Sequence, residues 1–264
     1  LIIPTYRSPE CLDICLRSAI EGQVRDDNEI IVIVDGFVDE SEHILTKYQD
    51  TIKVLRLESN QGMQTALNYG VMNALNENIM IVNDDNVLCV GWDSIFKDVK
   101  EGEVITINQI EPTGPGIFKF PVKDLGRSPA DFNYDAFVDY ESQIAQEKFT
   151  PDGGIFPFVL KKKNYMMVGG FDTMYQSPFI CDWDFFLTLE LAGLKFKRSH
   201  AYHFYHFGSS ATKNGKDGEA FKATEGPAAE TYIYKWGTHP SLYENNSHSP
   251  KGQKIKGIQF SYEK

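Results

Sequence analysis

Two adjacent carboxylates, Asp84 and Asp85, stand between two asparagines directly after a short apolar run. Neighbouring carboxylates repel each other, and a bound cation or a raised pKa relieves that repulsion. A hard divalent cation with oxygen ligands and a bound diphosphate suits such a group of residues. The alternative interpretation is a solvent-exposed, aspartate-rich turn that binds nothing.

Two earlier segments also have residue types that contact ligands. Asp35 closes a β-branched run and precedes Gly36, which fits either a tight turn or a ligand contact. Residues 59–62 read Ser-Asn-Gln-Gly and precede a helical pattern. A glycine at a helix N-terminus lets backbone amides approach a phosphate, with help from the helix dipole. Serine and asparagine are also common helix caps, so this segment has a purely structural interpretation as well.

Two later pairs of residues have both a structural and a chemical interpretation. Asp182 and Asp184 flank Trp183 at the start of a predicted helix, where the helix dipole alone favours acidic residues. His203 and His206 lie among aromatic residues, so each is either a packed core side chain or a metal ligand. Neither pair identifies a function by itself, and their meaning depends on the elements that position them.

The first hundred residues alternate between strand-like and helix-like patterns. Glu29 to Val34 is apolar on both faces, which is typical of a parallel strand covered by helices. Ser8 followed by Pro9 is a typical helix start. We expect strands at 1–3, 29–34, 52–57 and 79–82, and helices that begin at Pro9, span 40–48 and begin near Met63.

This alternation predicts a doubly wound, mostly parallel α/β sheet. In such sheets ligands bind outside the carboxyl ends of the strands, where Thr5, Asp35, Asn60, Asp84 and Asp85 all fall. In the second half we expect strands at 104–107, 155–160 and 195–206, and helices at 161–168, 182–192 and 219–236. Residues 111–153 show no pattern that assigns them to an element.

The composition excludes several classes of protein. The 264 residues include 37 Asp and Glu against 26 Lys and Arg, and a net charge of −11 disfavours a broad nucleic-acid interface. The longest apolar run, Ile30 to Val34, is far too short for a transmembrane segment. Four cysteines without a C-x-x-C pair favour a reducing compartment. We therefore expect a cytoplasmic protein, with peripheral contact to a membrane surface as an alternative. The sequence begins inside a predicted strand without Met, so we also expect residues to precede it.

Taken together and in this order, the motifs resemble the family 2 inverting glycosyltransferases of the GT-A fold. The resemblance extends from about Leu1 to Gly237. In the first half it rests on IIPTYR, IIVIVDG, NQGMQTALNYG and IMIVNDDN. In the second half it rests on VGGFDTMY, CDWDFFLTLELAG, YHFGSS and YKWG. Each motif is weak alone, and their common order carries the resemblance.

The resemblance implies how the donor is bound. In this family the sugar is carried on a nucleotide diphosphate, and a divalent metal, Mn²⁺ or Mg²⁺, holds the diphosphate as it leaves. Asp85 is then the expected metal ligand, with His206 as a further ligand. Asp84 is expected to contact the nucleotide ribose or to belong to the coordination shell of the metal. The other residues expected to contact the nucleotide are Thr5, Tyr6, Arg7, Asp35, Gln61 and Gly62.

The resemblance also implies the reaction. Asp182 matches the family's catalytic base, and a single displacement inverts the anomeric centre. Gly170, Trp183 and Asp184 are expected on the acceptor side, where Asp184 either supports the helix start or orients the acceptor. We expect a metal-dependent hexosyl transfer from a nucleotide-diphospho-sugar, most commonly a UDP-sugar, to a hydroxyl of a glycan, lipid-linked or protein-linked acceptor.

The resemblance further implies one domain in two parts. Residues 1–108 form a Rossmann-like half that binds the nucleotide-sugar, residues 109–237 form a smaller half that binds the acceptor, and residues 238–264 are a tail. Two positions depart from the family pattern. Asn83 stands where the first acidic residue of the D-x-D motif is expected, and Cys181 replaces the acidic residue that usually precedes the base.

Two other functions fit parts of the sequence. The departures at Asn83 and Cys181 motivate a non-catalytic nucleotide-sugar or carbohydrate-binding module on the same fold. A sugar-phosphate nucleotidyltransferase on a related α/β fold is the second alternative. That chemistry usually needs a glycine-rich phosphate loop after the first strand, and residues 4–8 (Pro-Thr-Tyr-Arg-Ser) contain no glycine.

Overall fold

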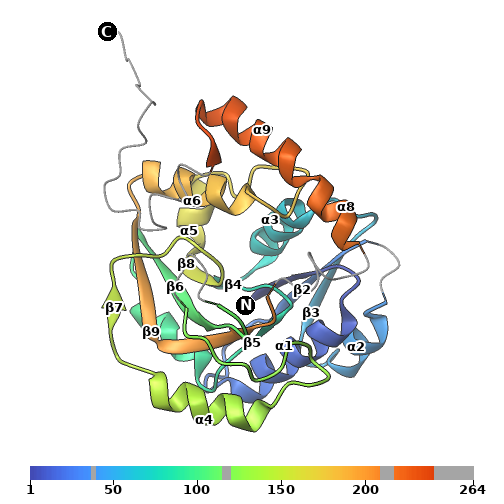
Figure 1. Cartoon of the computed structure of the whole chain (residues 1–264), viewed down its shortest axis with the longest axis vertical. Coiled ribbons are helices and arrows are strands. Elements are labelled where there is room, and N and C mark those ends of the chain that lie inside the picture. The colour runs from blue at the N-terminus through green and yellow to red at the C-terminus, as the bar shows by residue number, and fades with distance from the viewer. Residues whose placement is uncertain (37–39, 115–119, 209–216, 241–264) are drawn as a thin grey trace.

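The computed structural model describes residues 1–36, 40–114, 120–208 and 217–240 (Figure 1). Among these residues one mixed sheet of nine strands runs through the protein. The strands are β1 (Ile2–Thr5), β2 (Ile31–Asp35), β3 (Lys53–Leu57), β4 (Asn78–Ile81), β5 (Asn86–Val87), β6 (Glu103–Ile110), β7 (Phe149–Thr150), β8 (Phe158–Lys161) and β9 (Lys195–His206). They pair in the order β3-β2-β1-β4-β8-β6-β9-β5, and β7 pairs with β9.

Helices cover both faces of this sheet, as Figure 1 shows. The helices are α1 (Pro9–Gly22), α2 (Glu42–Lys47), α3 (Met63–Asn73), α4 (Tyr134–Ile144), α5 (Lys162–Met167), α6 (Cys181–Leu191), α8 (Gly218–Ala223) and α9 (Glu225–Trp236), with a 3₁₀ helix at Trp92–Asp98. None of the helices in the described ranges is long and apolar enough to cross a membrane.

The first half follows the expected α/β pattern because β2 is buried at every position. Strands β1, β2 and β3 pair in parallel, and β4 pairs in parallel with β1. Since successive side chains of a strand face opposite sides, Val32 and Val34 pack on the side of α1 and α2. Ile31 and Ile33 pack on the side of α3. The expected doubly wound, mostly parallel architecture is confirmed.

The second half joins the same sheet. Strand β8 pairs antiparallel with both β4 and β6, and β6 pairs in parallel with β9. The boundary expected at residue 108 falls within β6. Of the expected tail, residues 241–264 lie outside the described residues, as do Ser209 and Ser210 of the YHFGSS motif.

Most predicted elements are confirmed to within a few residues, but the helix expected over 219–236 is two helices. Helix α8 ends at Ala223, and α9 begins after Thr224. Pro227 explains the break because its ring would clash with the carbonyl of Ala223, four residues earlier, in a continuous helix. Pro227 is tolerated in the first turn of α9, where its missing N–H has no helical partner.

Three local predictions also differ from the structure. The strand expected from residue 155 begins only at Phe158, because Pro157 has no N–H to donate to a neighbouring strand. The unassigned stretch contains α4, whose cap Asn133 accepts a hydrogen bond from the Ala136 amide at 3.0 Å. Ser8 occupies the cap position of α1, but its side chain makes no capping hydrogen bond.

At Gly70, helix α3 packs closely on the side chains of β1 and β2. A Cβ there would lie 2.5 Å from Ile33 Cδ1 and 2.9 Å from Ile2 Cγ2. We expect Gly70→Ala to lower the free energy of unfolding by about 1–2 kcal/mol, because overpacking outweighs the helix propensity gained. Urea unfolding followed by circular dichroism measures this change. The control is Gly226→Ala in α9, where a Cβ meets nothing within 4 Å. Equal effects of the two substitutions would contradict the packing argument.

Candidate active site

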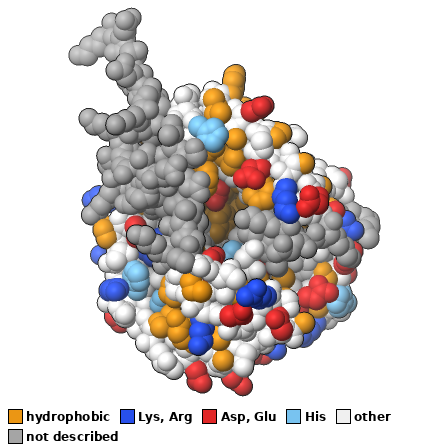
Figure 2. Space-filling model, in the orientation of Figure 1, with side chains coloured by type: hydrophobic (Ala, Val, Ile, Leu, Met, Phe, Trp, Pro, Cys, Tyr) orange, Lys and Arg blue, Asp and Glu red, His pale blue; other side chains and the backbone are white. Residues whose placement is uncertain are grey.

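The carboxyl ends of β1, β2, β4, β6 and β9 meet at a cavity of about 680 Å³. Figure 2 shows the hollow near the centre of the face below α9. Side chains from the start of α6 and from α8 and α9 complete its wall. The sequence-predicted residues that line it are Thr5, Tyr6, Asp35, Gly62, Asp84, Asp85, Asp182, Trp183 and His206. Arg7, Gln61, Gly170 and Asp184 do not line it.

A side chain at the end of β1 orients the acidic turn that follows β4. Thr5 Oγ1 donates a hydrogen bond of 2.7 Å to Asp84 Oδ2, and both residues are buried. The backbone amide of Asn86 donates to the backbone carbonyl of Asn83 at 3.2 Å and closes the turn. Thr5 therefore orients Asp84, while Asp85 lies on the adjacent part of the cavity wall.

His206 reaches this turn through strand pairing. It lies opposite Asn86 in the ladder between β5 and β9. Its Nε2 is 3.6 Å from Asp85 Oδ2, and its Nδ1 is 3.1 Å from Glu111 Oε1. Burial alone would lower the pKa of His206, but the charges and hydrogen bonds of Asp85 and Glu111 raise it to about 10. A metal bound by His206 must displace this proton.

Glu111 is a site residue that the sequence reasoning missed. It follows β6 and lines the cavity. The predicted strand ended at residue 107, which left Glu111 in an unassigned stretch. The available signal was the apolar Ile110, which continues the strand up to Glu111.

Asp35 binds the loop that precedes α3. Its carboxylate accepts hydrogen bonds from the amides of Gln61 at 2.6 Å and Gly62 at 2.9 Å. Burial raises the pKa of Asp35, and these two hydrogen bonds oppose the rise. The glycine at the start of α3 predicts that these amides approach a phosphate. Both backbone amides donate to Asp35 instead, so they are not available for the expected contact of Gln61 and Gly62 with a phosphate.

Arg7 is also placed differently from the expectation. Its guanidinium lies 3.1 Å from Asp217 Oδ2 and 3.6 Å from Glu40 Oε1, and its side chain is 37% exposed. These contacts connect the loop after β1 to the residue before α8. Tyr6, its neighbour, does line the cavity and packs edge-on against Phe221 of α8.

The opposite wall of the cavity begins with α6. Asp182 and Trp183 from its first turn line the cavity, and Asp182 Oδ1 accepts a hydrogen bond from the Trp183 amide at 3.0 Å. Asp184 is buried and bonded to Tyr175, Lys235 and Trp236. Its expected place on the acceptor side is therefore corrected, whereas the alternative expectation of support for the helix start agrees with these contacts.

Gly170 also has a packing role. Its φ is 76°, a conformation that favours glycine, and a Cβ there would lie 2.3 Å from Asn68 Oδ1 and 2.8 Å from Tyr165 Cε1. Asn68 is itself bonded to the Phe171 amide and to the Tyr165 hydroxyl. Gly170 does not line the cavity, and these contacts favour a packing role over the expected contact with a sugar.

The charges of the cavity decide whether a metal fits. Its charged lining residues within the described ranges include no Lys or Arg, and its carboxylates are Asp35, Asp84, Asp85, Glu111, Asp182 and Glu225. A diphosphate in such surroundings needs a cation for charge balance. Among the described residues, no three His, Cys, Asp or Glu side chains form a group that could hold a metal by themselves. Asp85 and His206 fit a cation that takes its other ligands from phosphate oxygens and water, as Mg²⁺ commonly does.

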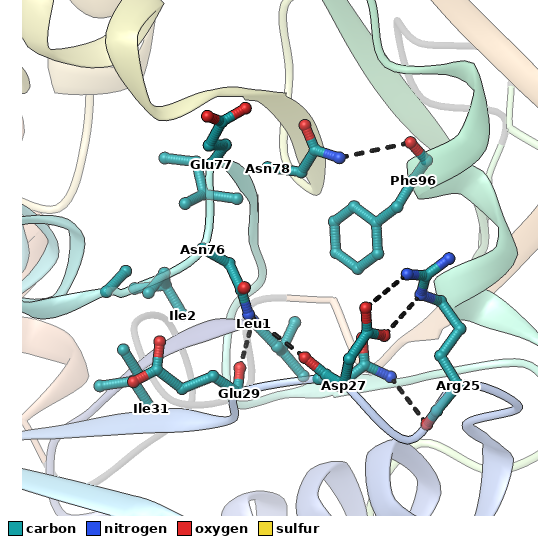
Figure 3. Close-up of a pocket in the computed structure, with 13 residues that line it drawn as sticks. Leu1, Ile2, Arg25, Asp27, Glu29, Ile31, Asn76, Glu77, Asn78 and Phe96 are labelled. Atoms are coloured by element: carbon teal, nitrogen blue, oxygen red, sulfur yellow. Dashed lines mark hydrogen bonds and ion pairs between the residues drawn. The ribbon is translucent and has the colours of Figure 1, made fainter.

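A second, smaller pocket of about 260 Å³ lies at the opposite ends of β1, β2 and β4. Figure 3 shows Arg25 and Asp27 joined by two hydrogen bonds, at 2.9 and 2.7 Å. The backbone nitrogen of Leu1 donates to the Glu29 carbonyl at 2.7 Å. None of the predicted site residues lines this pocket, so the candidate site is the larger cavity.

The sheet, its helices and the cavity at the strand ends define a fold of the GT-A type. TarS of S. aureus has this fold, with a TM-score of 0.57, 19% identity and coverage of 79% of this chain and 36% of that one. TarS 1–349 in complex with UDP-GlcNAc gives 0.55 and 18%, with coverage of 79% and 60%. GalNAc-T7 with UDP, GalNAc and Mn²⁺ gives 0.57 and 16%, with coverage of 78% and 43%. The matched region is thus less than two thirds of each of these chains.

Residues 1–101 match the model of the glycosyl transferase family 2. The resemblance to this family is thereby confirmed, on the part of the chain that contains β1 to β5. None of the curated proteins compared matches the sequence.

The placement of Gly170 predicts a defect in folding and none in ligand binding. We expect Gly170→Ala to lower the free energy of unfolding by about 2–3 kcal/mol, because a Cβ clashes with Asn68 in a strained backbone. Denaturant unfolding tests this, and UDP titration of the folded variant tests binding. The control is Gly169→Ala, with a φ of 82° but nothing within 4 Å of a Cβ, which should cost about 1 kcal/mol. A stable Gly170→Ala variant with weakened ligand binding would restore the original expectation.

Proposed function

We propose that this chain is an inverting glycosyltransferase that moves a sugar from a UDP-sugar to a hydroxyl acceptor. One observation carries the proposal: a single cavity contains Asp84, Asp85 and His206 on the sheet side and Asp182 on the α6 side. This arrangement provides a place for a leaving diphosphate and, across the cavity, a carboxylate for the incoming hydroxyl. The family match supports the same reaction class.

The donor half of the proposal uses the carboxyl ends of β1, β2 and β4. Tyr6 and Asp35 flank the space for the base, and Thr5 keeps Asp84 oriented toward the ribose. Solved structures of TarS with UDP-GlcNAc and of GalNAc-T7 with UDP support UDP as the nucleotide. We therefore take UDP-linked hexoses and N-acetylhexosamines as the first donors to test.

Asp85 and His206 are the residues that would hold a divalent cation, Mn²⁺ or Mg²⁺. When bound, the cation stabilises the negative charge that develops on the leaving diphosphate. The Mn²⁺ in the GalNAc-T7 structure supports this assignment by analogy of fold. Asp84, beside the pair, keeps its hydrogen bond to Thr5 and contributes to the negative potential that attracts the cation.

The transfer step needs a base for the acceptor hydroxyl. In the proposed reaction the acceptor oxygen bonds to the anomeric carbon, the bond from that carbon to the phosphate oxygen breaks, and the hydroxyl proton passes to Asp182. A carboxylate at hydrogen-bond distance from the hydroxyl is the requirement for this role. Attack from the face opposite the leaving group inverts the anomeric centre. Trp183, the next residue on the wall, offers a flat apolar surface to a sugar ring.

The departures from the family pattern support a binding module as the second candidate. Asn83 lines the cavity without a carboxylate, which removes one expected charge from the metal site. Cys181 is buried, donates weakly to the Pro178 carbonyl and does not line the cavity. The replacement of an acidic residue at this position therefore removes no charge from the cavity lining. A module of this kind binds a nucleotide-sugar but does not release UDP.

The metal assignment predicts metal-dependent stabilisation by one nucleotide. With UDP at 100 times its Kd and Mn²⁺ present, the free energy of unfolding should rise by about 2.7 kcal/mol. GDP, dTDP and CDP should give smaller effects in the same thermal-shift measurement. Asp85→Asn should lose the Mn²⁺-dependent part of the shift. Glu77→Gln, an exposed carboxylate at the far pocket, is the matched control and should keep it. An unchanged shift in Asp85→Asn would contradict the assignment.

The base assignment predicts loss of turnover without loss of donor binding. Asp182→Asn should lower transfer from the best donor among UDP-glucose, UDP-galactose, UDP-GlcNAc and UDP-GalNAc by a factor of about 10²–10⁴, because the proton has no acceptor. Calorimetric titration should give an unchanged Kd for UDP. Glu190→Gln, on α6 but away from the cavity lining, is the control for a charge change on the same helix. Burial raises the pKa of Glu190 to about 7, so the comparison is made at pH 8, where this carboxylate is charged. Near-native turnover in Asp182→Asn would remove this residue from the base role.

A further inference from the structure

The first turn of helix α6 carries two carboxylates that face different surroundings. Asp182 lines the cavity, whereas Asp184 is only 2% exposed. Residues two positions apart on an α-helix are separated by about 200° around its axis. A contact that holds Asp184 therefore also sets the rotation of the turn that carries Asp182.

Three donors surround the carboxylate of Asp184. The Tyr175 hydroxyl donates to Oδ1 at 3.1 Å, and Trp236 Nε1 donates to the same oxygen at 2.6 Å. Lys235 Nζ donates to Oδ2 at 2.9 Å. Lys235 and Trp236 both belong to the last turn of α9, so α9 holds α6 on the side away from Asp182.

The physical chemistry of this network favours a role in geometry. Burying an ion pair costs desolvation, and well-packed apolar residues of similar volume often stabilise a protein at least as well. The three hydrogen bonds to this carboxylate, however, can all form in only one orientation of the helix that carries it. Lys235 Nζ also lies 2.7 Å from Asp172 Oδ2, so the same ammonium contacts the segment between α5 and α6.

The backbone that leads into α6 has an unfavourable conformation. Ile180 has a φ of 71°, which is rare for a β-branched residue and persists only where the surroundings hold it. Gln64 Nε2 of α3 donates to the Ser177 carbonyl at 2.5 Å. Thr224, between α8 and α9, donates from Oγ1 to Ser177 Oγ at 2.8 Å. Helix α3 and the α8–α9 junction thus hold the segment that places the first turn of α6.

We propose that Asp184 is a positioning residue, and that α9 acts through Lys235 and Trp236 as a brace that holds Asp182 in the cavity. This inference rests on the proposed function, in which Asp182 is the base. None of the residues in the brace lies within residues 1–101, which the family model matches. The brace gives the Tyr-Lys-Trp-Gly segment a role that the sequence did not assign.

The test compares turnover with donor binding in Asp184→Asn. This substitution keeps the shape of the side chain, and Lys235 retains its contact with Asp172. We expect kcat for the best donor of the panel to fall at least tenfold. The KM for that donor and the Kd for UDP with Mn²⁺ should stay within twofold of the wild-type values, because the donor contacts lie on the sheet side of the cavity. A variant that is only less stable loses active enzyme, which also lowers the apparent kcat, so kcat is expressed per UDP-binding site counted by calorimetric titration. The tenfold fall should remain after this normalisation.

Asp172→Asn is the matched control. It removes a carboxylate from the same lysine but leaves the donors of Asp184 in place. Its kcat should stay within twofold of the wild-type value. Equal losses in the two variants, or a kcat within twofold of wild type in Asp184→Asn, would overturn the proposal.

Trp236→Phe keeps the test decisive if Asp184→Asn does not fold. It removes one donor from Asp184 and retains an aromatic ring beside Tyr232. We expect kcat to fall with KM unchanged, and a wild-type kcat in this variant would also overturn the proposal. A wild-type chain that binds UDP but releases none from any donor overturns the proposed function and this inference together. An active wild type with an equally active Asp184→Asn overturns the inference alone.

Discussion

A short antiparallel ladder determines the geometry of the cavity. Asn86 and Val87 of β5 pair with His206 and Tyr205 at the end of β9. This pairing brings two distant parts of the chain together, so that the imidazole of His206 faces Asp85 at 3.6 Å. Because β6 runs parallel to β9, its end also lies at this edge. The acidic wall of the cavity therefore depends on backbone hydrogen bonds between very short segments.

Much of the fold and part of the site could be predicted because their signals are local. The unbroken apolar run of β2 indicates a strand covered on both faces, and the structure agrees. Asp84, Asp85 and Asp182 follow or begin regular elements, and the order of those elements along the chain brought them to one edge of the sheet. The break between α8 and α9 was missed although its signal is local, since Pro227 cannot lie inside a continuous helix.

The remaining part of the site depends on which residues meet across the fold. An acidic residue at a helix start and an Asp-Gly pair after a strand each fit several partners, and the sequence does not choose among them. Asp35 proved to bind the amides before α3, and Asp184 proved to bind the last turn of α9. Glu111 was missed because β6 continues to Ile110, past its predicted end at residue 107, and its last residues pair with β9 only beyond a shift in register. Each of these outcomes requires the order of the strands, which periodicity does not contain.

The antiparallel strand β8 limits how this chain can be divided. It lies between β4 and β6, and Ile79, Met80 and Ile81 of β4 are buried beside it. A fragment that ended at residue 101 would lack β8 and leave the N–H and C=O groups along this edge of β4 unpaired. An open apolar edge of this kind is a template for pairing with other chains, and hence for aggregation. The strands that carry the family signature are therefore not a self-contained folding unit, and their resistance to self-association comes from a segment later in the chain.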